Sequence, residues 1–171
     1  MKTLYTIGYE GSDVDQLVET LVNVGVEVLA DVRELPLSRK KGLSKNGLAA
    51  KLADVGISYI HYRRLGDPKP GRDAAKAGNF DRFEHIFLDH LSKSDTQEAL
   101  RDLLQVADKE ITCMLCFERC SKHCHRSYLA DNAVARGFTV FDLVADRPKE
   151  YLKNGIKIPR YNPRQSLAAA E

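Results

Sequence analysis

One short segment of the chain holds most of the side chains that could do chemistry. It runs from Cys116 to Arg126 and reads CFERCSKHCHR, so thiols, imidazoles, a carboxylate and guanidinium groups follow one another closely. Cysteine thiolates act as nucleophiles and as metal ligands, and imidazoles exchange protons near neutral pH. These residue types at this spacing predict that the working site of the protein lies here.

Nucleophilic catalysis by a thiol is the first chemistry that this segment suggests. Cys116 stands where an apolar run ends and a helix is predicted to begin, close to the cations Arg119 and Arg126. A helix N-terminus and nearby cations lower the pKa of a thiol and favour the thiolate. His125 is the candidate base, with Glu118 to orient it, while packing or capping roles are the alternative. The catalytic candidates are therefore Cys116, Glu118, Cys124 and His125.

The stretch from Cys120 to Arg126 also matches the pattern Cys-x5-Arg. That pattern forms the phosphate-cradling loop of cysteine phosphatases and rhodanese-like sulfur transferases, in which the Cys attacks and the Arg holds the anion. In such loops the Cys directly follows a strand, whereas the predicted strand here ends at Cys116 and the usual glycines are absent. We therefore interpret this match as chance.

Metal binding is the third interpretation of the segment. Cys116, Cys120 and Cys124 offer soft ligands, and Cys120 and Cys124 would share one face of a helix. Structural zinc sites usually combine a closely spaced cysteine pair with a second pair of ligands elsewhere, and that second pair is missing. The three-cysteine set stays an alternative, and the sequence indicates no other cofactor. Cys113, in the middle of an apolar run, is expected to be a core residue.

A basic stretch supports an anion-binding site. The net charge of the chain is only +2, but residues 33–72 are rich in Lys and Arg. Arg side chains bind phosphate or carboxylate through paired hydrogen bonds, and a helix predicted after Ser44 adds backbone donors at its start. An ordinary solvated surface is the alternative. The expected partner is an anionic small molecule or a nucleic acid. The anion-binding candidates are Arg33, Ser38, Arg39, Lys45 and Arg126.

Five apolar runs in the chain predict β-strands, with helical patterns between them. Most of the runs are apolar on both faces, as in a parallel sheet that is covered on both sides. This alternation predicts an α/β fold: a single three-layer domain with a mostly parallel sheet of about five strands and helices on both faces. The predicted strands are Leu4–Tyr9, Val26–Arg33, Ile57–Tyr62, Ile111–Phe117 and Phe138–Val144.

Serine caps and terminal glycines define the helices between these strands. Ser12 and Ser44 each precede a helical pattern, and Ser94 begins a capping-box sequence. Residues 63–79 form a long connection with two prolines, which is typical of functional or disordered loops. The other predicted helices span Phe80–Leu91, Thr96–Ala107 and His123–Arg136.

This fold brings the carboxyl ends of the strands to one edge of the sheet, where ligands bind in open α/β folds. Residues from four strand ends should then meet at one rim, with Cys116–Arg126 as one wall and Arg33–Lys45 as the facing wall. His61 would reach the cysteines only if the third and fourth strands were neighbours. The further rim candidates are Tyr9, Glu10, Asp31, His61 and Arg63.

The length of 171 residues suits one domain, which we place at residues 1–146, followed by a basic C-terminal extension at 147–171. No apolar run reaches the roughly 18 residues of a membrane span, and the N-terminus lacks the features of a signal peptide. The four cysteines are clustered rather than spread as a disulfide framework requires. These features predict a cytoplasmic protein without a membrane partner, while its oligomeric state is not indicated.

Several motifs in one order are similar to a known family. The motif sequences are TIGYEG at 6–11, DVR at 31–33, PLSR at 36–39, GLSK at 42–45, LG at 65–66, CFE at 116–118 and CHR at 124–126. They resemble the domain-of-unknown-function family 488 over about residues 3–144. The resemblance implies no activity, because the family is uncharacterised, but it implies that the catalytic and anion-binding candidates match motif positions. Cys120 departs from the family pattern, which weakens the three-cysteine and Cys-x5-Arg hypotheses.

Three hypotheses about function stay open, and they differ in whether the protein is an enzyme. The first is an enzyme that acts on an anionic substrate such as a phosphate-bearing nucleotide or nucleic acid. The second is a nucleic-acid or nucleotide binding module without chemistry, against which stands the absence of a visible aromatic stacking platform or nucleic-acid motif. The third is a cysteine-ligated zinc or iron site.

Overall fold

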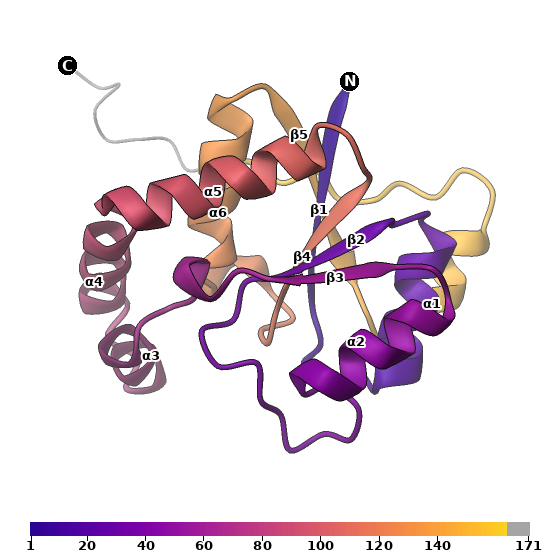
Figure 1. The fold of residues 1–171 in the computed structure, drawn as a ribbon, viewed down its shortest axis with the longest axis horizontal. Coiled ribbons are helices and arrows are strands. Elements are labelled where there is room, and N and C mark those ends of the chain that lie inside the picture. The colour runs from indigo at the N-terminus through magenta and orange to yellow at the C-terminus, as the bar shows by residue number, and fades with distance from the viewer. Residues whose placement is uncertain (164–171) are drawn as a thin grey trace.

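Five parallel strands alternate with helices along the chain, which confirms the predicted three-layer α/β fold (Figure 1). The structure is a computed structural model that describes residues 1–163, apart from the side chain of His123. Within that range, no helix is long and apolar enough to cross a membrane. The strands are β1 (Lys2–Gly8), β2 (Val28–Asp31), β3 (Ser58–His61), β4 (Thr112–Cys116) and β5 (Phe138–Val144). The α-helices are α1 (Val14–Asn23), α2 (Lys45–Asp54), α3 (Lys69–Lys76), α4 (Phe80–Ser92), α5 (Ser94–Ala107) and α6 (Arg126–Ala135), and the short 3-10 helices are η1 (Arg63–Leu65), η2 (Ser121–His123) and η3 (Pro148–Leu152).

The sheet has the strand order β3-β2-β4-β1-β5. Strand β4 lies between β1 and β2, with Cys116 opposite Gly8 and Leu115 opposite Asp31. Because all the strands are parallel, their carboxyl ends share one edge, as the rim prediction requires. Strand β2 separates β3 from β4, so the condition under which His61 would join the cysteines is not met.

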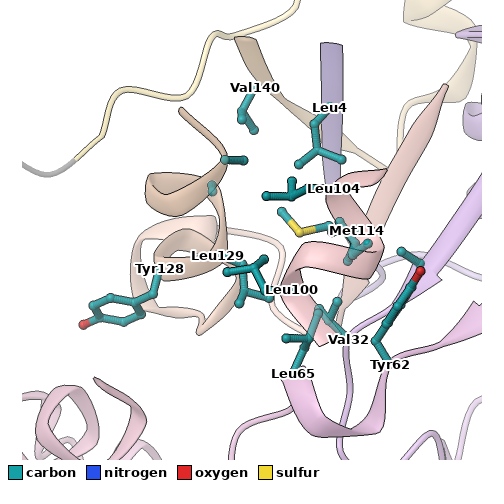
Figure 2. Packing of buried hydrophobic residues seen from close by; sticks show 14 of the residues in the cluster. Leu4, Val32, Tyr62, Leu65, Leu100, Leu104, Met114, Tyr128, Leu129 and Val140 are labelled. Carbon is teal, nitrogen blue, oxygen red and sulfur yellow. The ribbon is translucent and has the colours of Figure 1, made fainter. Parts of the chain in front are cut away.

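Each face of the sheet has its own hydrophobic core, as strands that are apolar on both faces require. On one face, leucines of α1 and α2 pack against β2 and β4. On the other face, Leu100 and Leu104 of α5 and Leu129 of α6 lie around Met114 of β4 (Figure 2). Each fully buried side chain of this size contributes roughly 1.5–3 kcal/mol to folding. The two cores fix the central strands, and with them the ends of those strands.

The connections that leave β1 and β4 run on opposite faces of the sheet. The chain after β1 enters α1 on one face, whereas the chain after β4 enters α6 on the other (Figure 1). Neighbouring parallel strands whose connections diverge in this way leave a crevice at their carboxyl ends, where ligands of open α/β folds bind. The crevice begins where the Tyr9 N–H still donates to the Cys116 carbonyl at 3.3 Å.

Residues 63–79 are more regular than the sequence predicts, because they contain η1 and α3. Two prolines in this stretch favoured an irregular connection, but Pro68 is the N-cap of α3 and Pro70 lies in its first turn. The first turn of a helix does not need the N–H group that proline lacks. The prediction of a connection without secondary structure was therefore wrong.

Two helix starts also differ from the prediction. Helix α1 is capped by Asp13 rather than Ser12, because Asp13 and Gln16 form a reciprocal capping box. The Ser12 hydroxyl donates instead to the Tyr9 carbonyl at 2.9 Å. Helix α5 begins after Lys93 without a side-chain cap, so the capping box predicted at Ser94 was wrong.

The helix predicted over His123–Arg136 is divided in two. The 3-10 helix η2 ends at His123 and α6 begins only at Arg126, so Cys124 lies between them. Cys120 precedes η2 and is exposed, whereas Cys124 is buried. The helix face that Cys120 and Cys124 were expected to share therefore does not exist.

The described part of the C-terminal extension runs along the outer edge of β5. The Asp142 N–H donates to the Pro159 carbonyl at 2.9 Å, and the Tyr161 N–H donates to the Val140 carbonyl at the same distance. The Tyr161 side chain is buried in the core on the α6 face. Residues 164–171 of the predicted extension lie outside the described residues.

Candidate functional site

A pocket of about 560 Å³ opens at the crevice between β1 and β4. Its walls come from the ends of β1, β2 and β4, from residues 34–37, and from α3 and α4. Three of the four catalytic candidates, Cys116, Glu118 and His125, line it. Much of the remaining wall is apolar and includes Leu35, Leu37, Phe80, Phe83 and Phe117.

Cys116, Cys124 and His125 meet beside this pocket. All three are buried, and their sulfur and ring nitrogen atoms lie within 4.8 Å of one another. Nδ1 of His125 is 3.6 Å from Sγ of Cys116 and 3.8 Å from Sγ of Cys124. Cys116 and His125 reach the pocket wall, whereas Cys124 is not part of its lining. The segment that the sequence singles out thus places two thiols and one imidazole in a single cluster.

A backbone carbonyl determines which nitrogen of His125 faces the thiols. Nε2 of His125 lies 2.7 Å from the carbonyl oxygen of Val32. A carbonyl can only accept a hydrogen bond, so Nε2 carries a proton in the neutral ring and in the charged ring alike. Nδ1 is therefore the atom that can exchange a proton with Cys116 and Cys124.

The electrostatics of the cluster favour a thiolate. Burial alone would raise the pKa of Cys124, but hydrogen bonding with Cys116 and the positive charges of Arg126 and His125 lower it well below its ordinary value. Burial and the negative charge of Cys124 raise the pKa of Cys116. Although burial opposes it, the Cys124 thiolate raises the pKa of His125 to about 9. At neutral pH the cluster therefore holds an imidazolium and a pair of sulfurs that retains one proton.

Glu118 is placed to exchange a proton with Cys116. The Cys116 thiol donates to its Oε2 at 3.0 Å. Burial, followed by the negative charge of Cys124, raises the pKa of Glu118 to about 7. A carboxyl group with that pKa is partly protonated at neutral pH and can act as an acid or as a base.

Arg126 supports the site from behind the pocket wall. Its guanidinium is fully buried and donates to the backbone carbonyls of Glu118 and Arg119 and to Oγ1 of Thr6. The loop can approach β1 this closely only because residue 8 is glycine: a Cβ there would lie 1.7 Å from the Glu118 carbonyl oxygen. The arginine thus shapes the loop after β4 and presents its charge to the thiols.

Asp31 and Arg33 form a buried ion pair at the end of β2. Nη2 of Arg33 lies 2.6 Å from Oδ2 of Asp31, and its Nη1 donates to the Leu43 carbonyl at 2.9 Å. The hydroxyl of Tyr59 donates to the same Asp31 carboxylate, and the Tyr9 ring lies under the guanidinium with its centroid 5.2 Å away. Arg33 lines the pocket, but its charge is balanced by Asp31. Its main role here is to tie the loop before α2 to the sheet.

The other predicted anion-binding residues lie on the segment that borders the pocket. Leu35 and Leu37 line the pocket, and Lys45 follows in the chain with its N–H donating to the Pro36 carbonyl at 2.9 Å. The N–H of Ser38 donates to Oγ of Ser44 at 3.0 Å. The side chains of Lys45 and of Arg39 are exposed and outside the lining. Direct anion binding by these residues stays a prediction.

The remaining rim candidates do not line the pocket. Nε2 of His61 lies 2.8 Å from the Arg33 carbonyl, and Glu10 accepts from the Arg119 N–H at 3.0 Å. Arg63 is exposed at the start of η1. His61 and Glu10 therefore support the backbone around the site rather than its surface.

Comparison with models of protein families matches residues 13–133 to a family described as "Domain of unknown function DUF488". The chain belongs to the DUF488 family. The matched range includes the pocket residues from β2, α3 and α4 and the whole segment from Cys116 to Arg126. No curated protein and no solved structure gives a significant match.

Asp67 is the pocket residue of this DUF488 chain that the sequence prediction missed. It is buried, lines the pocket, and its Oδ1 has no hydrogen-bond partner within the described residues. Gly71 in α3 leaves room for it, since a Cβ at that position would lie 2.1 Å from Oδ1. A single aspartate in a predicted loop carries no spacing signal. Its position directly after the LG motif at 65–66 is the signal that could have found it.

Within residues 1–163 of the DUF488 chain, the group of side chains that could hold a metal ion is Cys116, Cys124 and His125. This group differs from the three cysteines that the sequence suggests, because His125 takes the place of Cys120. A ligating imidazole usually donates its other N–H to a carbonyl or carboxylate, and Val32 provides that carbonyl. The donor set is therefore chemically suited to zinc or iron.

Proposed function

We propose that the protein is a thiol-dependent enzyme, with Cys116 as the nucleophile toward a small phosphate-bearing substrate. One observation carries the proposal: two thiols and an imidazole gather in a polarised cluster where a pocket opens at the crevice between β1 and β4. A binding module without chemistry has no need of a buried thiolate and imidazolium, which are costly to bury. The pocket volume of about 560 Å³ suits a small molecule.

The proposed reaction gives a role to Cys116, Cys124, His125 and Glu118. Cys116 passes its proton to the Cys124 thiolate, and its sulfur forms a bond to an electrophilic centre of the substrate. The bond to the leaving group breaks, and the leaving group takes the proton of the Glu118 carboxyl. In hydrolysis, water then attacks the same centre and gives its proton to Glu118, while the bonding pair returns to Cys116. Cys124 then returns the proton to Cys116, which restores the starting pair. His125 stabilises the thiolate of the pair before the attack and after the hydrolysis, whichever sulfur carries it.

The anionic part of the substrate is assigned to the mouth of the pocket. Arg39 and Lys45 form no ion pair within the described residues, whereas Arg33 is neutralised by Asp31. Their segment is continuous with Leu35 and Leu37 of the pocket wall. A phosphate group at the mouth would thus meet unpaired cations, while the reacting group lies beside Cys116.

The reactivity of Cys116 toward iodoacetamide tests the proposal. We use a Cys120→Ser background, because Cys120 is exposed and outside the cluster. The pair of thiols should react with a pH midpoint well below the value of about 8.5 for an ordinary thiol, because the pair loses its first proton at low pH. The adduct should form on Cys116, which lines the pocket, whereas Cys124 does not. Mass spectrometry of the peptide locates the adduct. Cys113 is buried and burial raises its pKa, so it should stay unmodified.

Two further variants make this test specific. Cys116→Ala should abolish the low-pH reaction. Cys124→Ala should move the midpoint upward, because the hydrogen bond between the two sulfurs that stabilises their shared thiolate is lost. A midpoint near 8.5 for Cys116 in the Cys120→Ser protein would remove the nucleophile role.

A cysteine-ligated metal site is the second candidate function, favoured by the same group of three ligand atoms. Protein purified under reducing conditions without chelator would then carry close to one equivalent of zinc or iron, measured by elemental analysis. Cys124→Ala should lose the metal, whereas Cys120→Ser should keep it. Less than about a tenth of an equivalent in the unmodified protein would remove this candidate.

A further inference from the structure

We propose that this pocket binds the base of a nucleotide, with the Asp67 carboxylate accepting a hydrogen bond from an amino group of the base and residues 39–45 meeting the phosphate. The inference deepens the proposed function, on which it rests, by naming the substrate class of the same site. It stands on three features: a buried acceptor without a partner, an aromatic wall, and a basic segment that follows Leu35 and Leu37 of the pocket wall in the chain.

The Asp67 carboxyl group is an acceptor that the protein leaves unused. The residue is only 7% exposed, yet its Oδ1 has no hydrogen-bond partner within the described residues. Buried polar groups are almost always paired in folded proteins. The Asp67 side chain lines the pocket and its carboxyl group accepts no hydrogen bond within the described residues, so it offers an acceptor to a donor that arrives with a ligand. The neighbouring Arg72 does not meet this need, because its guanidinium donates to Glu34 and to the backbone carbonyl of Asp67.

An aromatic wall gives the pocket a surface on which a flat ring can stack. Tyr9, Phe80, Phe83 and Phe117 all line it, and the Tyr9 and Phe117 rings meet edge to face with centroids 5.3 Å apart. Phe80 and Phe117 are each 44% exposed, so part of each ring is accessible to a ligand. Stacking of bases on aromatic side chains is a major source of nucleotide affinity. These rings come from three separate segments, so the sequence alone did not reveal the platform.

The basic segment completes the match to a nucleotide. It spans residues 39–45, from the long loop between β2 and α2 in Figure 1 to the first residue of α2. Lys40 in this segment donates to the Ser12 carbonyl, whereas Arg39, Lys41 and Lys45 make no ion pair within residues 1–163. A pocket with aromatic rings and an unpaired carboxyl group in its wall, next to a basic segment outside the lining, fits a base inside and a phosphate outside.

The acceptor also predicts which bases bind. A carboxylate pairs well with the amino groups of adenine, cytosine and guanine. Uracil has no amino group, and its one N–H on the pairing edge is flanked by two carbonyl oxygens that a carboxylate repels. CMP and UMP are a matched pair of probes, because their pairing edges differ while sugar and phosphate are identical.

The test measures dissociation constants of AMP, GMP, CMP, UMP and ribose 5-phosphate by calorimetry. CMP should bind the wild type roughly tenfold to a hundredfold more tightly than UMP, because only CMP offers the carboxylate an amino group. Asp67→Asn should bring the CMP-to-UMP ratio close to one, because an amide both donates and accepts. The matched variant Asp73→Asn, an exposed aspartate on the adjacent helix, should leave the ratio unchanged. Phe117→Ala should weaken all four nucleotides by about tenfold and spare ribose 5-phosphate.

The outcomes separate this inference from the proposed enzyme. Binding is measured in Cys116→Ala as well, where thiol chemistry is absent. Nucleotide binding that depends on Asp67, in a protein without an activated thiol, would rule out the proposed thiol-dependent enzyme and would leave this inference standing. An activated thiol together with ribose 5-phosphate binding as tightly as AMP, or a CMP-to-UMP ratio that Asp67→Asn does not change, would overturn this inference alone. A single-stranded oligonucleotide arm distinguishes the two sources, because tighter binding than CMP assigns the nucleotide to a nucleic acid.

Discussion

An Arg126→Met variant is expected to lose roughly 3–5 kcal/mol of its free energy of unfolding, because it removes a buried charge from a hydrogen-bonded network. The guanidinium of Arg126 is fully buried and donates to Oγ1 of Thr6 and to the carbonyls of Glu118 and Arg119. Methionine fills similar space but leaves these acceptors without donors, and each unsatisfied buried acceptor costs about 1–3 kcal/mol. Urea unfolding followed by circular dichroism measures the loss.

The same variant should also change the chemistry of the thiols. The positive charge of Arg126 is among the causes that lower the pKa of Cys124, so its removal raises that pKa. The pH midpoint for alkylation of Cys116, in the Cys120→Ser background, should therefore move upward. A purely structural role would leave the midpoint in place once the folded fraction is taken into account.

Arg126→Lys is the control that separates charge from hydrogen bonding. A lysine ammonium keeps the charge but cannot reproduce the fork of the guanidinium toward three acceptors. The lysine variant should therefore lose stability while keeping an alkylation midpoint close to that of the parent. If the methionine and lysine variants share one midpoint, the charge of Arg126 does not act on the thiols.

The architecture could be predicted from the sequence because its signals are local. The apolar run Phe138–Val144 is the observed β5 residue for residue, and Ser44 stands at the N-cap of α2 as predicted. Alternating strands and helices then leave few topologies, since connections between parallel strands are right-handed and need a crossover helix. The prediction failed at α3, where Pro68 and Pro70 read as loop residues although both stand at a helix start.

The candidate site could be predicted only in part, because partners in space have no sequence spacing. Cys116, Glu118 and His125 were found because they are near one another in the chain and follow a strand. Arg33 reads as a free cation in the sequence, but Asp31, two residues earlier, is its buried partner. Asp67 reads as an ordinary loop residue, and its burial depends on α3 and on the glycine at position 71.

Asp67→Asn is expected to stabilise the protein at pH 7.5 by up to about 3 kcal/mol, because one unit of pKa shift corresponds to about 1.4 kcal/mol. Burial raises the pKa of Asp67 from 3.8 to about 6, against the opposing positive charges of His125 and Arg72. The folded state therefore holds this proton up to a higher pH than the unfolded state does. The carboxyl group destabilises the fold progressively as pH rises from 3.8 to about 6, and the full effect is present above that window.

Urea unfolding of wild type, Asp67→Asn and Asp73→Asn at a series of pH values from 3.5 to 7.5 measures this window. The advantage of Asp67→Asn should be smallest at the acidic end and grow to its plateau above about pH 6. Glu118, with a pKa of about 7, titrates in every variant and cancels in the difference, whereas His125, with a pKa of about 9, stays charged across this range. Asp73→Asn, at an exposed site, should stay within about 0.5 kcal/mol of wild type throughout. An Asp67→Asn protein that is less stable at pH 7.5, or whose advantage is the same at every pH, would contradict the buried, unpaired carboxylate.

A gain in stability from Asp67→Asn would bear directly on what the pocket is for. A buried carboxylate that weakens the fold at neutral pH has no structural benefit, and groups of this kind persist where function requires them. We expect the same variant to show higher stability and to lose the preference for CMP over UMP. The two results together would link both properties to the Asp67 carboxyl group. The unpaired carboxyl group of Asp67 in the pocket wall then marks the place where a ligand, rather than the protein, supplies a donor.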